Sequence, residues 1–183
     1  MSTFMDTFKE FFTSFDVLHK SLSPKFNRDM VFKAGEGAGR SGSFFFFSHD
    51  RKFIIKTMTS GELKLFLRIL PGLATHHKDV PESLLAKIFG VFKVKTSKVS
   101  AVYIMLMENT LRLKDPDKLN YIFDLKGSLV DRKVKGVTKP SSTLKDLNFL
   151  MVAKKNKHLT ALKKHDQRLI KAALSKDVEF LRL

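Results

Sequence analysis

Residues 35–56 read GEGAGRSGSFFFFSHDRKFIIK. Gly37, Gly39 and Gly42 form a G-x-G-x-x-G pattern, which occurs both in dinucleotide-binding proteins and in kinases. A dinucleotide-binding fold needs a helix directly after the glycines, so that the helix N-terminus meets the pyrophosphate. The residues that follow the glycines therefore decide between the two classes.

Those following residues predict strands. Four phenylalanines at 44–47 precede a polar turn at 48–51, and the run Phe53-Ile54-Ile55-Lys56 comes next. This order is typical of two strands joined by a turn. A glycine loop closing a hairpin, with a lysine on the next strand, is the kinase arrangement. Backbone amides of such a loop can approach phosphates, and Lys56 supplies a positive charge to them.

The composition limits the class of protein. A chain of 183 residues with 43% hydrophobic residues can form one domain, or one and a part, around a real core. There is no cysteine, which excludes a disulfide framework and a thiolate metal site and suits the cytosol. Asp6, Lys9 and Glu10 interrupt the apolar N-terminus, so we expect no secretory signal. No run approaches the roughly 18 apolar residues of a transmembrane helix.

The net charge of +16 is concentrated toward the C-terminus. Residues 132–183 hold fourteen basic against four acidic side chains, whereas residues 1–50 hold six of each. Such a surface attracts polyanions, either nucleic acid or an anionic membrane leaflet. A solvated surface that only aids solubility is the alternative.

Phenylalanines recur at helical spacing near the N-terminus and predict an amphipathic helix over residues 3–20, ended by Ser23-Pro24. Its polar face mixes acidic and basic residues and has no basic stripe. We therefore favour packing on its own domain, or on a second copy, over a membrane-surface helix.

Thr59-Ser60-Gly61-Glu62 has the form of a capping box, which predicts a helix that begins after Thr59. The apolar positions that follow continue to Pro71-Gly72, where we expect the helix to stop. Glu62 then has two alternative roles. It can bond back to the helix cap, or it can pair with Lys56 as the glutamate of a kinase helix does.

Further along, the sequence pattern predicts short helices and strands that are separated by turns. We expect a short helix over 82–89, followed by hairpin strands over 91–95 and 99–107, the second of them central in the sheet. A strand over 121–125 and a helix capped by Thr143 and ending at Met151 should follow. The last element is a basic helix over 158–182, with these residues facing inward: Leu159, Leu162, Leu169, Ala173 and Leu174. Asp115-Pro116-Asp117 is expected to form a turn.

Asp124-Leu125-Lys126-Gly127-Ser128 forms a second motif at the end of a predicted strand. An acid and a base two positions apart on a strand project to the same side, and the glycine lets a substrate approach. In phosphoryl transfer the acid can orient the attacking hydroxyl, and the lysine can neutralise the phosphate. Alone, the motif is better explained as a surface ion pair; combined with the glycine loop and Lys56, it favours catalysis.

The chain resembles the phosphatidylinositol phosphate kinase family from about residue 35 to its last residue. The pieces that carry the resemblance occur in family order: Arg40-Ser41-Gly42-Ser43-Phe44-Phe45, Ile54-Ile55-Lys56-Thr57, Leu70-Pro71-Gly72, 84–91, Leu106-Met107-Glu108-Asn109, Phe123-Asp124-Leu125-Lys126-Gly127-Ser128, 143–147 and 177–181. The piece that contains Asp124 is the most specific of them.

The resemblance implies an ATP- and Mg²⁺-dependent lipid kinase that phosphorylates the inositol ring of a phosphatidylinositol monophosphate, typified by phosphatidylinositol-4-phosphate 5-kinases. It implies Asp124 as the catalytic aspartate and Lys126 as a contact of the transferred phosphate. Met107 to Thr110 would connect the two lobes and face adenine. The implied nucleotide-binding residues are Gly37, Gly39, Arg40, Ser41, Gly42, Ser43, Lys56, Glu62, Met107 and Asn109.

The implied fold is α+β, a protein-kinase-like N-terminal lobe of antiparallel sheet plus helix with the start of a C-terminal lobe. We expect a helical segment over 1–30, the ATP-binding lobe over 31–111, and the catalytic motif with a basic helix over 112–183. The implied location is cytoplasmic, peripheral on the cytoplasmic face of membranes, where anionic phosphoinositides are the partners. Apolar surface that a missing lobe leaves unburied favours a homodimer or aggregation.

The family's second, magnesium-binding aspartate and its lipid-reading activation loop have no counterpart in the 183 residues, so the sequence identifies no metal ligand. We expect an incomplete kinase: a piece of a longer one, a truncated gene product or a decayed paralogue. A non-catalytic membrane-binding module of the same fold is the first alternative. A nucleic-acid binder is less favoured, because residues 132–183 lack interleaved aromatics and a recognised motif of that class.

Overall fold

The structure is a computed structural model of the chain. It describes residues 15–28, 33–34, 43–95, 97, 100–111, 120–136, 142–156 and 162–182. Internal contacts divide the chain into two units. Unit 1 comprises Met1–Arg112 with Ala173–Leu183, and unit 2 comprises Leu113–Ala172.

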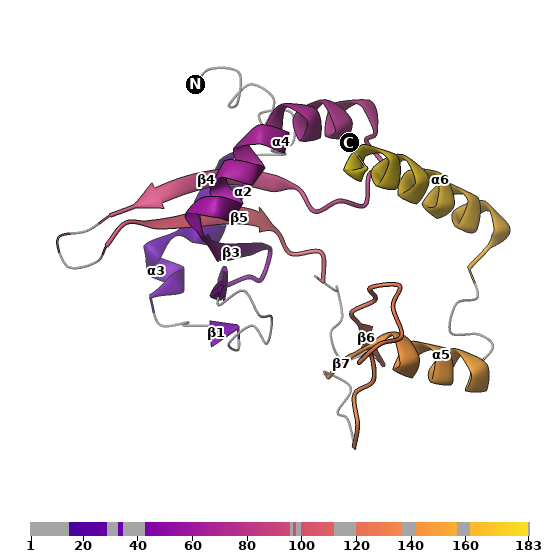
Figure 1. Cartoon of the computed structure of the whole chain (residues 1–183). Coiled ribbons are helices and arrows are strands. Elements are labelled where there is room, and N and C mark those ends of the chain that lie inside the picture. The colour runs from indigo at the N-terminus through magenta and orange to yellow at the C-terminus, as the bar shows by residue number, and fades with distance from the viewer. Residues whose placement is uncertain are drawn as a thin grey trace. The chain divides into compact units, whose positions relative to one another are not determined.

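Unit 1 is built on an antiparallel sheet with the strand order β1-β2-β3-β5-β4 (Figure 1). The strands are β1 (Lys33–Ala34), β2 (Phe45–Phe47), β3 (Phe53–Met58), β4 (Ile88–Val94) and β5 (Val102–Glu108). The predicted hairpin after the glycines is confirmed, with Phe47 opposite Ile54 and Phe45 opposite Lys56. The apolar strand β5 lies between β3 and β4, which confirms its predicted central place.

Two short N-terminal helices, α2 (Phe15–Leu22) and α3 (Pro24–Asn27), dock on the turn between β2 and β3. Ser21 donates to Asp50 Oδ2 at 2.6 Å, and the His49 amide donates to Asn27 Oδ1 at 2.9 Å. Ser21 is completely buried. Burial disfavours the charged form of Asp50, yet its hydrogen bonds from serines and Lys52 hold the pKa of that carboxyl below its ordinary range. Residues 3–14 of the helix predicted over 3–20 lie outside the described residues.

Helix α4 (Ser60–Asp79) lies across the sheet and carries the core of unit 1 (Figure 1). Phe66 and Leu73 pack with Met58 of β3 and Met105 of β5. The predicted stop at Pro71-Gly72 is wrong, because the helix continues through Pro71 for two more turns. Proline lacks an amide donor and weakens a helix, but the burial of Leu73 beyond it offsets that cost.

The C-terminal end of helix α6 (Lys164–Leu181) belongs to unit 1 and is fastened there by Asp177. Asp177 Oδ1 lies 2.7 Å from His76 Nε2 and accepts from Ser83 Oγ at 2.7 Å. Its Oδ2 accepts from the Leu84 amide at 2.8 Å. Burial opposes the charge, but these donors outweigh it and lower the pKa of Asp177. The carboxylate is therefore an acceptor for two separate segments of unit 1.

These contacts correct two sequence predictions. The predicted helix over 82–89 is wrong: residues 81–87 form turns and irregular backbone, and the strand β4 begins at Ile88. The bonds from Ser83 and Leu84 to Asp177 hold this segment in place of helical bonds. The predicted inward face of the helix is confirmed only at Ala173, which is buried. Asp177 is buried as well, whereas Leu169 and Leu174 of α6 and Leu162 before it are exposed. Leu159 lies outside the described residues.

Unit 2 contains a parallel strand pair, β6 (Ile122–Phe123) and β7 (Thr143–Leu144), followed by α5 (Asp146–Lys155). The Phe123 and Phe149 rings meet edge to face at 5.2 Å between centroids, which packs α5 on β6. The predicted strand ending near Asp124 is confirmed in shortened form. Thr143 does not cap the helix as predicted, because it pairs with Ile122 in the strand and the helix begins three residues later.

We predict that Asp177→Asn lowers the free energy of unfolding by about 2 kcal/mol. The amide retains one acceptor oxygen, but it loses the charge-assisted bonds that a buried carboxylate receives. Urea denaturation followed by circular dichroism measures the change. Glu179→Gln, at an exposed carboxylate on the same helix, is the matched control and should change stability by less than about 0.5 kcal/mol. Equal effects of the two variants would contradict the anchoring role of Asp177.

Candidate functional site

The first half of the predicted site is an ion pair between a strand and a helix of unit 1. Lys56 of β3 donates from Nζ to Glu62 Oε1 of α4 at 2.9 Å. The Lys56 side chain is 25% exposed and the Glu62 side chain 33% exposed. The pair therefore fixes the lysine while leaving part of the ammonium group open to a ligand.

Glu62 performs both of the roles that the sequence left as alternatives. While Oε1 pairs with Lys56, Oε2 accepts from the Thr59 amide at 2.8 Å and from Thr59 Oγ1 at 3.1 Å. Thr59 Oγ1 in turn accepts from the Glu62 amide at 3.2 Å, which completes the capping box. The Thr59 amide, followed by the Lys56 ammonium, lowers the pKa of Glu62 to about 2. The carboxylate is thus charged over the whole physiological range.

Two other residues that were predicted to bind the nucleotide, Met107 and Asn109, lie at the end of β5. Met107 pairs with Ile54 and packs against the core of unit 1. Asn109 is 7% exposed, and its Nδ2 donates to the Arg51 carbonyl at 2.8 Å. Its Oδ1 accepts from the Leu111 amide at 3.2 Å. The Asn109 side chain therefore shapes the backbone that leaves β5.

The glycine segment is described only at its end. Gly37, Gly39, Arg40, Ser41 and Gly42 lie outside the described residues. Ser43 is described and is 6% exposed. The adjoining Phe44 amide donates to Thr57 Oγ1 at 2.8 Å, beside Lys56 on β3.

The second half of the predicted site lies in unit 2, at the end of β6. Asp124 follows the strand directly, and its amide donates to the Leu144 carbonyl of β7 at 2.8 Å. The Asp124 side chain is 50% exposed, and Lys126 and Gly127 are exposed as well. Gly127 has φ of +66°, a left-handed conformation that favours glycine. The turn at Gly127 therefore presents an acid and a base to solvent on an ordered backbone.

Two buried residues that sequence reasoning did not select, Arg132 and Asp146, support this turn. Asp146 Oδ1 accepts from the Lys126 amide at 3.0 Å and from the Gly127 amide at 2.9 Å. Arg132 Nε donates to Asp146 Oδ2 at 2.7 Å. Arg132 chiefly lowers the pKa of Asp146, to about 2, and Asp146 in return raises the pKa of Arg132. The position of Asp146 in the first turn of α5 could have indicated this role from the sequence. That inference requires knowing that β7, which precedes the helix, pairs with β6.

Comparison with known proteins identifies the family. The sequence pattern described as Phosphatidylinositol-4-phosphate 5-Kinase matches residues 27–183. The chain belongs to this family. The predicted family membership and the α+β, kinase-like N-terminal lobe are thereby confirmed.

Several curated proteins match much of the chain. A probable phosphatidylinositol phosphate kinase of Dictyostelium discoideum is 43% identical over 61% of the chain. Phosphatidylinositol 4-phosphate 5-kinase 8 of Arabidopsis thaliana is 35% identical over 76% of the chain, and the type-1 beta enzyme of Gallus gallus is 37% identical over 61%. These matches cover 15%, 17% and 21% of the three relatives, so the chain spans about a fifth of their length or less.

The family's kinase chemistry raises the question of a metal site. Within the described ranges, no group of three or more histidine, aspartate or glutamate side chains is arranged to hold a metal ion. Glu62 and Asp146 are committed to the hydrogen bonds given above, which leaves Asp124 as the exposed carboxylate of the motif. The described residues thus do not form a magnesium site.

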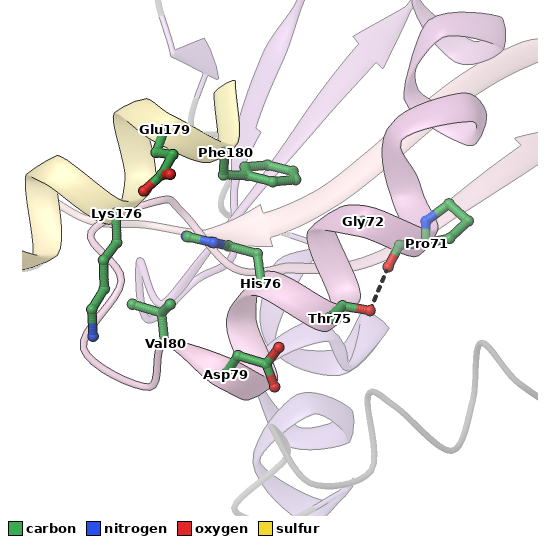
Figure 2. Close-up of a pocket in the computed structure, with 9 residues that line it drawn as sticks. All are labelled: Pro71, Gly72, Thr75, His76, Asp79, Val80, Lys176, Glu179 and Phe180. Atoms are coloured by element: carbon green, nitrogen blue, oxygen red, sulfur yellow. Dashed lines mark hydrogen bonds between the residues drawn. The ribbon is translucent and has the colours of Figure 1, made fainter. Parts of the chain in front are cut away.

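A separate groove of about 650 Å³ lies where α4 meets the end of α6 (Figure 2). The His76 and Phe180 rings stack in it with centroids 4.7 Å apart. Gly72 allows this approach, because a Cβ there would lie 3.3 Å from the Phe180 ring. None of the predicted site residues lines this groove.

We predict a pH signature for Glu62. Because its pKa is lowered from 4.5 to about 2 on folding, its stabilising charge is complete above about pH 4.5 and is lost as the pH falls toward 2. Glu62→Gln keeps a capping acceptor but removes the charge. The variant should have a lower Tm than the wild type at pH 7, and the difference should narrow below pH 4.5.

Thermal unfolding at a series of pH values measures this difference. Glu179→Gln, which replaces an exposed carboxylate on α6, is measured over the same range as the matched control. A Glu62→Gln offset that is independent of pH would contradict the charged pairing with Lys56.

Proposed function

We propose that the chain is the nucleotide-binding and catalytic-motif part of a phosphatidylinositol phosphate kinase. The reaction is transfer of the ATP γ-phosphate to the inositol ring of a phosphatidylinositol monophosphate, with phosphatidylinositol 4-phosphate and its 5-hydroxyl as the specific substrate and position. Family membership supports the class of reaction. The names of the relatives support the particular substrate.

The observation that carries the proposal is the Lys56–Glu62 pair at 2.9 Å. An ammonium has three donors, and Glu62 takes one of them, so Lys56 retains donors for an anionic ligand. Its quarter-exposed side chain can reach phosphate oxygens while the ion pair prevents it from moving freely. Lys56 would hold the α- and β-phosphates of ATP, and the glycine segment ending at Ser43 would cover them. Met107 and Asn109 would border the adenine.

Asp124 and Lys126 supply the chemistry in this proposal. Asp124 accepts the proton of the attacking inositol hydroxyl and orients its oxygen, while Lys126 stabilises negative charge on the phosphate that is transferred. Both side chains need solvent exposure to meet a lipid headgroup, and both have it.

An anionic membrane surface is the proposed location of the substrate. The exposed basic side chains of unit 2 support this part of the proposal, among them Lys133, Lys135, Lys154, Lys155, Lys164 and Arg168. Each juxtamembrane basic residue contributes about 1 kcal/mol to binding at an anionic leaflet. In the described part of the chain, none of the helices combines the length and apolar composition needed to span a bilayer. A peripheral attachment at the cytoplasmic face follows from the proposal.

We also propose that the chain forms a homodimer. The exposed side chains of Leu65 and Ile69, one turn apart on the same side of α4, support it, because a second copy would remove their apolar surface from water.

Lys56→Met should weaken the binding of a fluorescent ATP analogue at least about tenfold. The variant removes a charge-assisted hydrogen bond to phosphate, and a tenfold change corresponds to about 1.4 kcal/mol. Lys64→Met, at an exposed lysine of α4, is the matched control and should leave the affinity unchanged. Equal affinities for wild type and Lys56→Met would contradict the nucleotide role of Lys56.

Phosphate transfer from labelled ATP to liposomes containing phosphatidylinositol monophosphates tests the reaction itself. Asp124→Asn should reduce the product about a hundredfold or more, because it removes the proton acceptor. Liposomes that contain each monophosphate isomer separately identify the substrate. Absence of transfer by wild-type protein that is folded and binds ATP would contradict the catalytic proposal and favour a non-catalytic, membrane-binding role.

A further inference from the structure

The turn that carries Asp124 and Lys126 has an internal support of its own. Asp146 and Arg132 lie beneath it, each only 7% exposed, whereas the two predicted catalytic side chains are exposed. Buried charged side chains are costly unless they are paired and hydrogen-bonded, so a buried pair in this place needs an explanation.

One carboxylate oxygen fixes the backbone of the turn. Asp146 Oδ1 accepts from the successive amides of Lys126 and Gly127, at 3.0 and 2.9 Å. The second of these residues, Gly127, adopts a left-handed φ of +66°. A Cβ at position 127 would meet no atom within 4 Å, so the left-handed backbone, and not lack of space, favours glycine there.

The other carboxylate oxygen holds an arginine that reaches back to Asp124. Arg132 Nε donates to Asp146 Oδ2 at 2.7 Å. Its Nη2 donates to the Asp124 carbonyl oxygen and lies 3.3 Å from Asp124 Oδ2. The planar guanidinium thus contacts both acids through different nitrogens, which a lysine at this position cannot do.

The arginine is itself held by α5. The Leu147 amide donates to the Arg132 carbonyl at 3.0 Å. Asn148 accepts from the Val134 amide at 2.8 Å and donates to the Val134 carbonyl at 3.0 Å. The segment 132–134 is therefore fastened to the start of the helix that supplies Asp146. Both members of the pair are anchored independently of the turn that they contact.

We infer that Asp146 and Arg132 are positioning residues, which hold the turn from Asp124 to Gly127 in one conformation and orient the Asp124 carboxylate. The catalytic consequence rests on the function proposed above for Asp124 and Lys126. The inference that the two residues hold the turn does not depend on that function, so the structural role and the catalytic consequence can be tested separately. Asp146 acts through the backbone of the turn, and Arg132 acts through the carbonyl and carboxylate of Asp124.

Amide hydrogen exchange by NMR tests the structural statement without any need for activity. In Asp146→Asn, the amides of Lys126 and Gly127 should exchange about tenfold faster or more, because charge-assisted acceptors are about twice as strong as neutral ones. Arg132→Lys should accelerate the same two amides. The Phe149 and Asn156 amides inside and at the end of α5 should keep their wild-type rates, which shows that the unit remains folded.

Asp131→Asn is the matched control. It removes one negative charge from the same loop at an exposed residue with φ of +54°, a conformation that asparagine tolerates as well as aspartate does. It should leave exchange at Lys126 and Gly127 unchanged. Unchanged exchange in folded Asp146→Asn and Arg132→Lys would overturn the inference, as would equal acceleration in Asp131→Asn.

Steady-state kinetics in the liposome assay tests the catalytic consequence. Arg132→Lys should lower kcat about tenfold and leave the KM for ATP unchanged, because nucleotide binding is assigned to Lys56 and the glycine segment. A raised KM for ATP with unchanged kcat would overturn the catalytic role of Arg132 as a positioning residue. If the wild-type chain transfers no phosphate, the proposed function fails and hydrogen exchange alone decides whether the two residues position the turn.

Discussion

The Glu62 carboxylate joins helix α4 to strand β3, and the geometry of unit 1 depends on its two oxygens. Oε2 closes the helix cap at Thr59, while Oε1 holds Lys56 on the strand. A shift of the helix along the strand would break the contact with Lys56, so the start of α4 is fixed relative to that residue of β3. The same arrangement keeps the Lys56 ammonium in place with part of it exposed, which is what binding of an anionic ligand requires.

Carboxylates anchor the other junctions in the same way, although the chain is strongly basic. Asp50 holds α2 through Ser21, Asp177 holds α6 against His76 and Ser83, and Asp146 holds the turn after β6. A carboxylate can accept several bonds from different directions, and each donor lowers its pKa against the cost of burial. Three acids thereby connect segments that are far apart in the sequence.

Anchors of this kind explain where sequence reasoning went wrong. The helix signal ended at Pro71, but Leu73 and His76 beyond it are buried, and packing outweighs the lost amide bond. The segment 82–89 has helical spacing, yet Ser83 and Leu84 bond to Asp177 and the chain enters β4. Of the residues predicted to face inward on α6, Ala173 is buried but Leu169 and Leu174 are exposed, and the acid Asp177 packs inward instead of them. Each error concerns a contact with a distant segment.

The sequence by itself determined the class of the protein: the glycine pattern followed by a hairpin, the capping box, and the Asp124 motif with its family resemblance all depend on local spacing. Local spacing is readable because turns, caps and strand alternation involve neighbouring residues. Only the tertiary structure decided that Glu62 serves the cap and Lys56 together, and that Asp146 and Arg132 support the turn at Asp124. Those roles depend on which strands pair and which helices pack. Strand pairing and helix packing bring distant segments together, and a buried charged side chain finds its partner on such a segment.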